Sequence, residues 1–452
     1  MLKKNDIIEL EITALTNEGN GVGRHEGIAV FVPFTAAGDI ISCRIVKVRK
    51  SYCYGIVSDI ITPSPDRCGS GCGIYGKCGG CSFRHMTYPA ELRAKEQIVR
   101  DAFERIGGLH PEFCGILGAE QTDRYRNKAQ FPVAADENGR LYSGFYARRS
   151  HRAIETSDCP LLPEVFCGIC ADILDYANEH GVTAYDELTG EGLLRHIYIR
   201  RGVHSGEIMA ALVVTSDECA ALFRPLAEAL AEKYSGIKSV LLNINSRRTN
   251  AILGESVIPL FGSDRIHDTM CGRKIAISLH SFYQINTVQA ERVYRLAAEK
   301  ASLGGSETLL DLYCGAGTIG LSMADRVGKL IGVEVVSQAI ENAKENAAAN
   351  DIGNAEFICA DAGRAAQMLY DRGELPDVII ADPARKGCTP DTLEYMAKMH
   401  PSRIVMISCN PATAARDCAE LEKLGYRVIS VTPADLFPRT EHVECVVHLE
   451  KT

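Results

Sequence analysis

The segment LLDLYCGAGTIG, residues 309–320, decides the fold of the C-terminal half. Its apolar run leads directly into a glycine-rich turn, after which a helix can begin. Apolar runs and helical stretches alternate from about residue 288 onward, which predicts a doubly wound α/β sheet finished by a β-hairpin. The expected strands cover residues 308–312, 329–335, 356–360, 377–381, 403–408, 427–432 and 443–449.

Acidic residues follow the glycine turn at the ends of the expected strands. Glu334 lies nineteen residues after Gly315, where an acid can hydrogen-bond ribose hydroxyls, so a nucleotide-type ligand is expected at this edge of the sheet. Asp361 is placed to reach an adenine amine, and Asp382 ends the fourth strand. Acids beside the ligand suit a cationic sulfonium better than a pyrophosphate, which favours a methyltransferase. The alternative is a tight strand-to-helix turn without a ligand.

Two further groups with chemical potential lie at strand ends. Cys409 stands between a buried strand and a helix that starts with Pro411. Helix N-terminal amides there are expected to lower its pKa and raise its thiolate fraction. The alternative for Cys409 is a buried structural cysteine. Glu444 opens the last strand, and a carboxylate entering an apolar strand is expected to be paired or functional.

A cluster of cysteines lies in a glycine-rich loop at residues 67–85. Cys72, Cys78 and Cys81 have the spacing of metal ligands, and the glycines allow the backbone to wrap closely around a metal centre. Three thiolates need a fourth ligand for a tetrahedral zinc or an iron–sulfur cluster. From the residues alone, both Cys68 and Cys159 are candidates.

The N-terminal residues 1–61 predict a small β-barrel. Alternating apolar residues indicate strands at 7–12, 28–32, 40–48 and 54–61. Turns are expected at Gly19, Gly21, Gly23 and Gly27. Basic residues lie on or just after the third strand, at Arg44, Lys47, Arg49 and Lys50. They indicate either a solvated face or a nucleic-acid-binding barrel of the oligonucleotide-binding type.

The middle of the chain mixes helices and strands. Residues 88–106 predict an amphipathic helix, and a second helix is expected at 219–234. Asn138-Gly139 predicts a hairpin turn. Residues 121–152 hold seven Arg and Lys against three acids, which indicates an RNA track or solvated faces. The pair Cys167 and Cys170 falls in an apparent helix and is expected to pack as small apolar residues.

Composition limits the class of protein. The 452 residues predict two to four domains, and 46% hydrophobic with 24% charged residues exclude a disordered chain, a collagen-like fibre or a coiled coil. The net charge of -9 argues against a generally basic surface but not against a local patch. No long apolar stretch and no secretory signal are visible, so we expect a cytoplasmic protein with reduced cysteines and no membrane contact.

Together these residues resemble the RNA uracil-C5 methyltransferase family, in particular its iron–sulfur branch that methylates 23S rRNA. The resemblance covers essentially the whole chain and implies a multidomain α/β protein. The implied domains are a TRAM β-barrel at 1–61, an iron–sulfur cluster loop at 62–87, a helical segment packing on the methyltransferase domain at 88–120, an α+β central RNA-binding domain at 121–270, and a Rossmann-like class I methyltransferase domain at 271–452.

The resemblance also implies site residues. A [4Fe–4S] cluster is expected on Cys72, Cys78, Cys81 and Cys159, which leaves Cys68 out. S-adenosylmethionine is expected to bind at Gln284, Tyr313, Gly315, Gly317, Glu334, Asp361 and Asp382. Cys409 matches the nucleophile of the family and Glu444 its base. The chain departs from the family pattern in Asp382-Pro383-Ala384-Arg385, where Ala384 replaces a proline; activity is expected to survive.

The implied reaction is methylation of a uridine. C5 of uracil is a weak nucleophile, so a thiolate from Cys409 must add at C6 first, and Glu444 must later remove the C5 proton. The expected partner is RNA, most specifically 23S rRNA, and the protein is expected to be a monomer without an obligate protein partner. Three alternatives remain: transfer RNA as the substrate, an NAD-dependent oxidoreductase with an accessory cluster, and a non-catalytic RNA-binding module.

Overall fold

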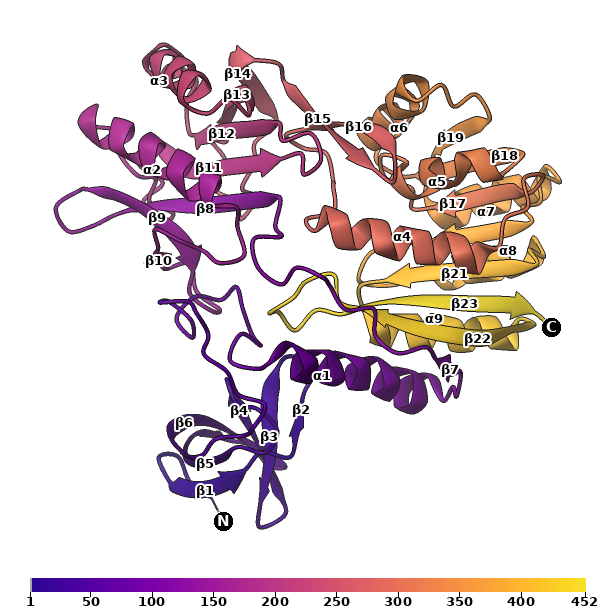
Figure 1. The fold of residues 1–452 in the computed structure, drawn as a ribbon, viewed down its shortest axis with the longest axis horizontal. Coiled ribbons are helices and arrows are strands. Elements are labelled where there is room, and N and C mark those ends of the chain that lie inside the picture. The colour runs from indigo at the N-terminus through magenta and orange to yellow at the C-terminus, as the bar shows by residue number, and fades with distance from the viewer. Residues whose placement is uncertain (1) are drawn as a thin grey trace.

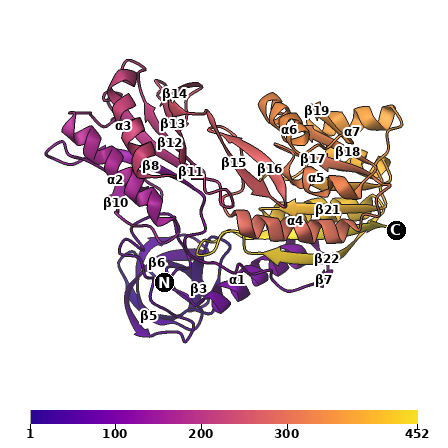
Figure 2. The same ribbon diagram turned by 45° about the horizontal axis from the view of Figure 1, so that its top comes forward.

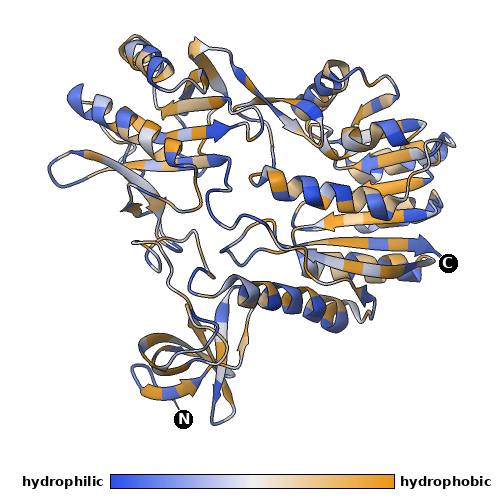
Figure 3. Ribbon diagram, viewed as in Figure 1, coloured by the Kyte–Doolittle hydropathy of each residue, from blue (hydrophilic) through white to orange (hydrophobic). Residues whose placement is uncertain are grey.

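The computed structural model describes residues 2–452 and places them in three sheet-based units (Figures 1 and 2). The first sheet has six strands, the second seven and the third eight; a two-stranded hairpin lies between the second and the third. In Figure 1 the first unit lies below the second, and the third lies to their right. Hydrophobic residues concentrate in the strands, whereas the helices carry hydrophilic residues on their outer sides (Figure 3).

The N-terminal unit is a six-stranded sheet with the order β1-β5-β6-β4-β3-β2. Its strands are β1 (Ile7–Glu11), β2 (Ala14–Leu15), β3 (Asn20–His25), β4 (Ile28–Pro33), β5 (Ile40–Val48) and β6 (Tyr52–Thr62). The four expected strands are confirmed. The turns expected at Gly21 and Gly23 are wrong, because both glycines lie within β3. A Cβ at Gly21 would collide with the side chains of Thr35 and Ile12, so close packing rather than a turn explains this glycine.

The linking segment begins with the cysteine loop and continues into α1 (Tyr88–Asp101). A π-helical turn, Ala102–Gly107, ends α1 at Gly108, which has a φ of 65°. The expected helix at 88–106 is therefore confirmed. The helical description of 88–120 is wrong beyond Gly108, because β7 (Glu112–Phe113) pairs in parallel with β22 (Tyr426–Ala434) at the edge of the third sheet.

Apolar residues of this linking segment complete the core of the third unit. Val99, Phe103 and Leu109 are buried in the same cluster as residues of the C-terminal sheet. Burial of such side chains contributes about 1.5–3 kcal/mol each. The end of α1 and the turn that follows it are thereby attached to the C-terminal unit by packing.

The central unit has the strand order β10-β9-β8-β11-β12-β13-β14. Its strands are β8 (Lys128–Ala135), β9 (Leu141–Tyr146), β10 (Ala153–Glu155), β11 (Leu194–Arg201), β12 (Ile208–Val214), β13 (Ile237–Ile244) and β14 (Ser256–Gly262). Two helices, α2 (Glu164–Glu179) and α3 (Ala220–Lys233), pack on it through a shared apolar core. The expected helix at 219–234 and the turn at Asn138-Gly139 are confirmed. Cys170 is buried in α2, as expected.

The hairpin of β15 (Arg265–Met270) and β16 (Arg273–Ser278) leads into the third unit. The domain boundary expected at residue 270 lies at the turn of this hairpin. The third unit follows the order β19-β18-β17-β20-β21-β23-β22-β7. Its main strands are β17 (Thr308–Leu312), β18 (Lys329–Glu334), β19 (Ala355–Cys359), β20 (Val378–Ala381), β21 (Arg403–Ser408), β22 (Tyr426–Ala434) and β23 (Glu444–Lys451).

Helices cover both faces of this third sheet. The helices are α4 (Thr287–Ala301), α5 (Thr318–Met323), α6 (Ser337–Ala349), α7 (Ala362–Asp371), α8 (Pro390–Lys398) and α9 (Pro411–Lys423), with a 3-10 turn at Ala324–Arg326. The first three share one apolar cluster, and the last three share another with α1. The doubly wound sheet with a final hairpin is confirmed. No helix among residues 2–452 is long and apolar enough to cross a bilayer.

Candidate active site

A cavity of about 770 Å³ lies at the carboxyl edge of the third sheet. Parallel strands end at the same edge, so the residues following β17, β18, β20 and β21 converge there. Most of the sequence-predicted site residues line this one cavity: Gln284, Tyr313, Gly315, Glu334, Asp361, Asp382, Cys409 and Glu444. The structure thus brings both proposed catalytic groups together with the expected ligand-binding residues, although these lie far apart in the sequence.

The glycine turn that follows β17 shapes the floor of the cavity. Tyr313 has a φ of 67°, an uncommon value for a residue with a side chain, and Gly315 has a φ of 55°. Gly317, with a φ of 81°, is the N-cap of α5 and does not line the cavity. A Cβ at Gly317 would lie 3.0 Å from Leu321 and 3.3 Å from Ala343, so this glycine serves the close packing of α5 and α6.

The acids expected at the ligand are held by backbone amides. Glu334 accepts hydrogen bonds from the amides of Gly315 at 3.2 Å and Val336 at 2.9 Å, which fixes its carboxylate beside the glycine turn. Asp361 accepts from the amide of Gly363 at 3.1 Å and caps α7. Both carboxylates are therefore oriented before any ligand arrives.

The cavity wall contains carboxyl groups whose charge is poorly compensated. Burial and, to a smaller extent, the neighbouring Asp382 raise the pKa of Glu444 to about 8, against the opposing effect of Arg385. Burial also raises the pKa of Asp382 to about 7. Behind the wall, the fully buried Asp311 accepts from the amide of Gly320 at 2.8 Å, and burial raises its pKa to about 7. Groups titrating near neutral pH in a cavity are typical of a catalytic site.

Cys409 lies at the end of β21, half-buried in the same wall. Burial raises its pKa, the carboxylates of Glu444 and Asp382 raise it further, and Arg385 opposes them. The expectation that helix amides lower this pKa is wrong. The side chain of Asn410 caps α9 by accepting from the amide of Ala412, and burial beside two carboxylates outweighs the remaining helix field.

Several residues of the cavity were not predicted as site residues. Phe282 is 73% exposed at the cavity although it is a large aromatic side chain. Arg385 is the cation that lowers the pKa of both Cys409 and Glu444. Phe437 approaches from the segment before β23. An isolated exposed aromatic has no signature in a sequence, whereas Arg385 follows Asp382 so closely that its proximity could have been inferred.

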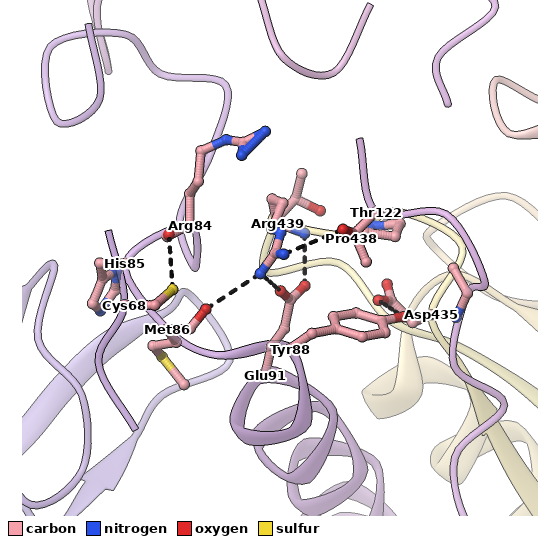
Figure 4. Close-up of polar contacts among 12 residues, drawn as sticks. Cys68, Arg84, His85, Met86, Tyr88, Glu91, Thr122, Asp435, Pro438 and Arg439 are labelled. Atoms are coloured by element: carbon pink, nitrogen blue, oxygen red, sulfur yellow. Dashed lines mark hydrogen bonds and ion pairs between the residues drawn. The ribbon is translucent and has the colours of Figure 1, made fainter. Parts of the chain in front are cut away.

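The segment between β22 and β23, residues 435–443, is held by a buried ionic cluster on α1; Figure 4 shows Glu91 of α1 beside Arg439 of this segment. Lys95 donates to Glu91 at 2.8 Å, to Asp435 at 2.7 Å and to the carbonyl oxygen of Phe437 at 3.1 Å. The amide of Arg439 donates to Glu91 at 2.7 Å. All three hydrogens of the Lys95 ammonium group are therefore used, and the segment that leads to Glu444 is fixed to α1.

The cysteine loop holds the same segment from its other side. The amides of Ser82 and Phe83 both donate to the carbonyl oxygen of Arg439, at 2.9 and 3.0 Å. Tyr125 donates to the carbonyl oxygen of Pro438 at 3.0 Å. The N-terminal half of the chain therefore positions Phe437 and the start of β23, where Glu444 lies.

The cysteine loop itself forms a separate cavity of about 270 Å³. Cys72, Cys78, Cys81 and Cys159 all line it, whereas Cys68 lies outside and contacts the carbonyl oxygen of Arg84 (Figure 4). Within residues 2–452, no three His, Cys, Asp or Glu side chains are gathered closely enough to hold a single metal ion. The structure therefore shows a four-thiol cavity but no metal site.

The donor set of this cavity fits a polynuclear centre better than a single ion. Four thiols surround one space, as the ligands of a four-iron cluster do. Arg84, Arg126 and Lys128 line the same space and can balance the charge of an anionic centre. The chemistry of the residues present is thus compatible with an iron–sulfur cluster.

The expected basic surfaces differ from each other. Arg44, Lys47, Arg49 and Lys50 are all exposed, and none has a carboxylate within 4.0 Å in the described part of the chain. In contrast, Arg124 is paired with Asp158, and Arg140 with Glu155. Three of the seven basic residues between 121 and 152, Arg124, Arg140 and Arg149, are therefore paired with carboxylates, and the barrel presents the freer basic face.

Comparison with known proteins agrees with this architecture. The family model described as tRNA (Uracil-5-)-methyltransferase matches residues 87–452, and the TRAM domain model matches residues 2–57. An uncharacterised RNA methyltransferase of Halalkalibacterium halodurans is 41% identical over 450 residues, covering 99% of this chain and 98% of the relative. One from Clostridium tetani is 41% identical over 446 residues, covering 99% and 96%.

A solved structure extends the comparison to three dimensions. The crystal structure of Pyrococcus abyssi tRNA (uracil-54, C5)-methyltransferase in complex with S-adenosyl-L-homocysteine matches with a TM-score of 0.77 and 25% identity, covering 98% of this chain and all of the other. Fold, site and family models agree over nearly the whole length. The chain belongs to the tRNA (uracil-5-)-methyltransferase family, with an N-terminal TRAM domain.

Proposed function

We propose that this protein transfers a methyl group from S-adenosylmethionine to C5 of a uridine in RNA, with 23S rRNA as the substrate. The observation that carries the proposal is the meeting of Cys409 and Glu444 in one cavity with the glycine turn. A nucleophilic thiol and a base beside a nucleotide-binding edge are the groups that this chemistry requires. An oxidoreductase or a simple binding module leaves both groups without a role.

S-adenosylmethionine supplies an electrophilic methyl group when bound. Glu334 is positioned for its ribose hydroxyls, because amides hold the carboxylate next to the glycine turn. Gln284, Tyr313, Gly315 and Asp382 line the same cavity, and Asp361 lies at the end of β19 where an adenine amine can be bound. Gly317 contributes by allowing α5 to pack closely rather than by contact.

The nucleophile is the thiolate of Cys409. Its sulfur forms a bond to C6 of the uracil, and the electron pair of the C5–C6 double bond makes C5 nucleophilic. After C5 has gained the methyl group, Glu444 takes the C5 proton; the electron pair of that C–H bond restores the double bond and expels the thiolate. Cys409 then returns to its starting state.

The charges in the wall of the active-site cavity favour these reaction steps. Glu444 has a pKa of about 8, so near neutral pH its carboxylate is a much stronger base than an ordinary glutamate. Arg385 lowers the pKa of Cys409 and therefore favours the thiolate against the neighbouring acids. A uracil stacked in RNA cannot reach this wall, so the base must be turned out, and the exposed ring of Phe282 offers it a stacking surface.

A [4Fe–4S] cluster on Cys72, Cys78, Cys81 and Cys159 is part of the proposal. The support is the cavity that all four thiols line, together with the three cations around it. Such a cluster would shape the loop whose residues Ser82 and Phe83 hold the segment before Glu444. We assign it no step in the reaction.

A second candidate substrate is a uridine of transfer RNA. The description of the matching family model and the substrate named for the Pyrococcus abyssi enzyme favour it. The test is methyl transfer from labelled S-adenosylmethionine to total RNA, followed by mapping of the labelled nucleotide. Label in 5-methyluridine of 23S rRNA supports the proposal, label only in transfer RNA moves it to the second candidate, and label on any other atom overturns both.

A further inference from the structure

A third cavity, of about 360 Å³, lies where residues 119–127 meet the N-terminal ends of α2 and α4. We call it the junction cavity. It shares no lining residue with the active-site cavity, and the reaction described above does not use it. Its rim includes exposed side chains such as Gln121 and Val288, so it is open to solvent.

The lining residues of the junction cavity carry polar atoms that are buried and have no partner. They are Nε of Arg126, Oδ1 of Asn127 and Nε of Arg201. Asn127 is only 1% exposed. Its Nδ2 donates to the carbonyl oxygen of Gln284 at 2.7 Å and to the hydroxyl of Thr287 at 2.9 Å, which fixes its orientation and leaves Oδ1 as a free acceptor. Buried polar atoms without partners are rare in folded proteins, and each of them calls for a water, an ion or a ligand.

The charges around the junction cavity favour an anion. Within residues 2–452, neither Arg126 nor Arg201 has a carboxylate within 4.0 Å. The two acids of the lining, Glu120 and Glu164, are 76% and 85% exposed and lie beside other arginines, Arg292 and Arg124. The first turn of the fifteen-residue helix α4 also lines the cavity and contains no acid, so its positive end adds to the attraction.

The donors and the acceptor of the junction cavity together indicate which ligand fits it. Unpaired guanidinium groups beside a helix N-terminus suit a phosphate, but the free Oδ1 of Asn127 repels phosphate oxygens and requires a donor. A phosphate next to a hydroxyl satisfies both, and RNA carries that pair in every nucleotide. We propose that the junction cavity binds one ribonucleotide of the RNA substrate, with its phosphate at Arg126 and Arg201 and its 2′-hydroxyl at Asn127; this rests on the proposed function.

The position of Asn127 indicates where the bound ribonucleotide lies relative to the uridine in the active-site cavity. Its backbone amide donates to the carbonyl oxygen of Ile285 at 2.9 Å, and its side chain holds Gln284 and Thr287. Gln284 lines the active-site cavity, whereas Thr287 lines the junction cavity. The two cavities therefore lie on either side of one short segment, and the bound ribonucleotide flanks the methylated uridine.

The test is the salt dependence of binding to a single-stranded uridine-containing oligoribonucleotide, measured by fluorescence anisotropy. Arg201→Gln should weaken binding roughly tenfold and reduce the slope of log K against log salt by about 0.7, the value for one phosphate contact on a single strand. Arg126→Gln should do the same, but Arg126 also lines the four-thiol cavity, so the Arg201 variant decides. The control Arg247→Gln removes an exposed arginine of the central unit that is paired with Glu255 and should change neither quantity. Wild-type affinity and slope in the Arg201 variant would overturn the proposal.

Further measurements distinguish a phosphate of RNA from free inorganic phosphate and check that the variants are folded. The oligodeoxyribonucleotide of the same sequence should bind the wild type more weakly, because it lacks the hydroxyl for Asn127. If Arg201→Gln alters binding of inorganic phosphate but not of the oligoribonucleotide, the cavity is a free phosphate site and the proposal is overturned. Unchanged S-adenosylmethionine affinity shows that the variants are folded. Absence of any RNA methylation by the wild type would reject the proposed function, whereas the salt slopes test the cavity independently.

Discussion

Two groups of buried ionisable side chains lie on either side of the segment 435–443 and are built in opposite ways. In the ionic cluster on α1, Lys95, Glu91 and Asp435 are completely buried, and each charge faces an opposite one at 2.7 or 2.8 Å. In the active-site wall, Asp382, Glu444 and Cys409 meet, and Arg385 opposes the accumulation of negative charge. With the guanidinium group of Arg439 at 3.5 Å from Glu91 as a second cation, the cluster on α1 has two positive charges for its two carboxylates, whereas the active-site wall is not balanced in this way.

The difference indicates what each group does. A matched cluster fixes the segment 435–443 without raising the energy of the folded state by an unpaired charge. An unmatched cluster holds protons that an ordinary carboxylate would have lost, which makes its members available for proton transfer near neutral pH. The first group therefore positions the second, because the segment held by Lys95 leads directly to Glu444.

The largest effect is expected when the matched cluster is broken. Lys95→Met leaves Glu91 and Asp435 buried without their cation and should lower the free energy of unfolding by about 3–5 kcal/mol. Urea denaturation followed by circular dichroism measures this. The matched control is Lys233→Met, which removes the partner of Asp172 at the exposed surface and should destabilise the protein far less, because solvent screens this pair. Equal losses in both variants would show that the ionic cluster has no special role.

The unmatched group should behave in the opposite way. Glu444→Gln removes a carboxyl whose pKa rises from 4.5 to about 8 on folding. Between these values the unfolded state has released the proton that the folded state keeps, so wild-type stability falls as pH rises and the variant lacks this loss. At pH 8 the variant should be more stable by roughly 1–3 kcal/mol, with the advantage vanishing near pH 4.5. A variant less stable than the wild type at pH 8 would contradict the assignment.

The same pKa shifts predict the pH dependence of the reaction. Glu444 must be ionised to accept a proton and Cys409 must be a thiolate, and both pKa values are raised. The rate of methyl transfer at saturating RNA should therefore fall by up to about tenfold for each pH unit below 8. A rate that is constant between pH 6 and pH 8 would show that neither group titrates where the structure places it.

The smallest effect on the folded protein is expected at the barrel. Replacing Arg44, Lys47, Arg49 and Lys50 by glutamine should change the free energy of unfolding by less than about 0.5 kcal/mol, because all four are exposed and unpaired in the described residues. RNA affinity should nevertheless fall, and its salt slope should decrease by up to about 0.7 for each lost phosphate contact. An unchanged slope would make this face a solvated surface only.

The sequence was sufficient for the features that depend on strand ends. The positions of Glu334, Asp382 and Cys409 at one edge follow from parallel topology, which the alternation of strands and helices already predicts. The glycine-rich turn at residues 314–317 likewise predicts a strand before it and a helix after it. The choice between Cys68 and Cys159 needed the family resemblance, and the structure places Cys159 in the four-thiol cavity.

The features that depend on distant contacts were not predictable. Lys95 and Asp435 are 340 residues apart, and nothing in either neighbourhood indicates the other. Gly21 looked like a turn residue because its close neighbours Thr35 and Ile12 become visible only in the fold. The pKa of Cys409 was predicted in the wrong direction for the same reason: the helix that follows is local, whereas the carboxylate of Glu444 arrives from another strand.

The central claim is that Cys409 and Glu444 act in sequence on one uridine. It is tested most directly by incubating Glu444→Gln and Cys409→Ala with RNA and labelled S-adenosylmethionine and separating the products on denaturing gels. Glu444→Gln should accumulate a covalent protein–RNA species that carries the labelled methyl group, because addition and transfer precede proton removal. Cys409→Ala should form none. Normal turnover by Glu444→Gln, or the same adduct with Cys409→Ala, would contradict the account.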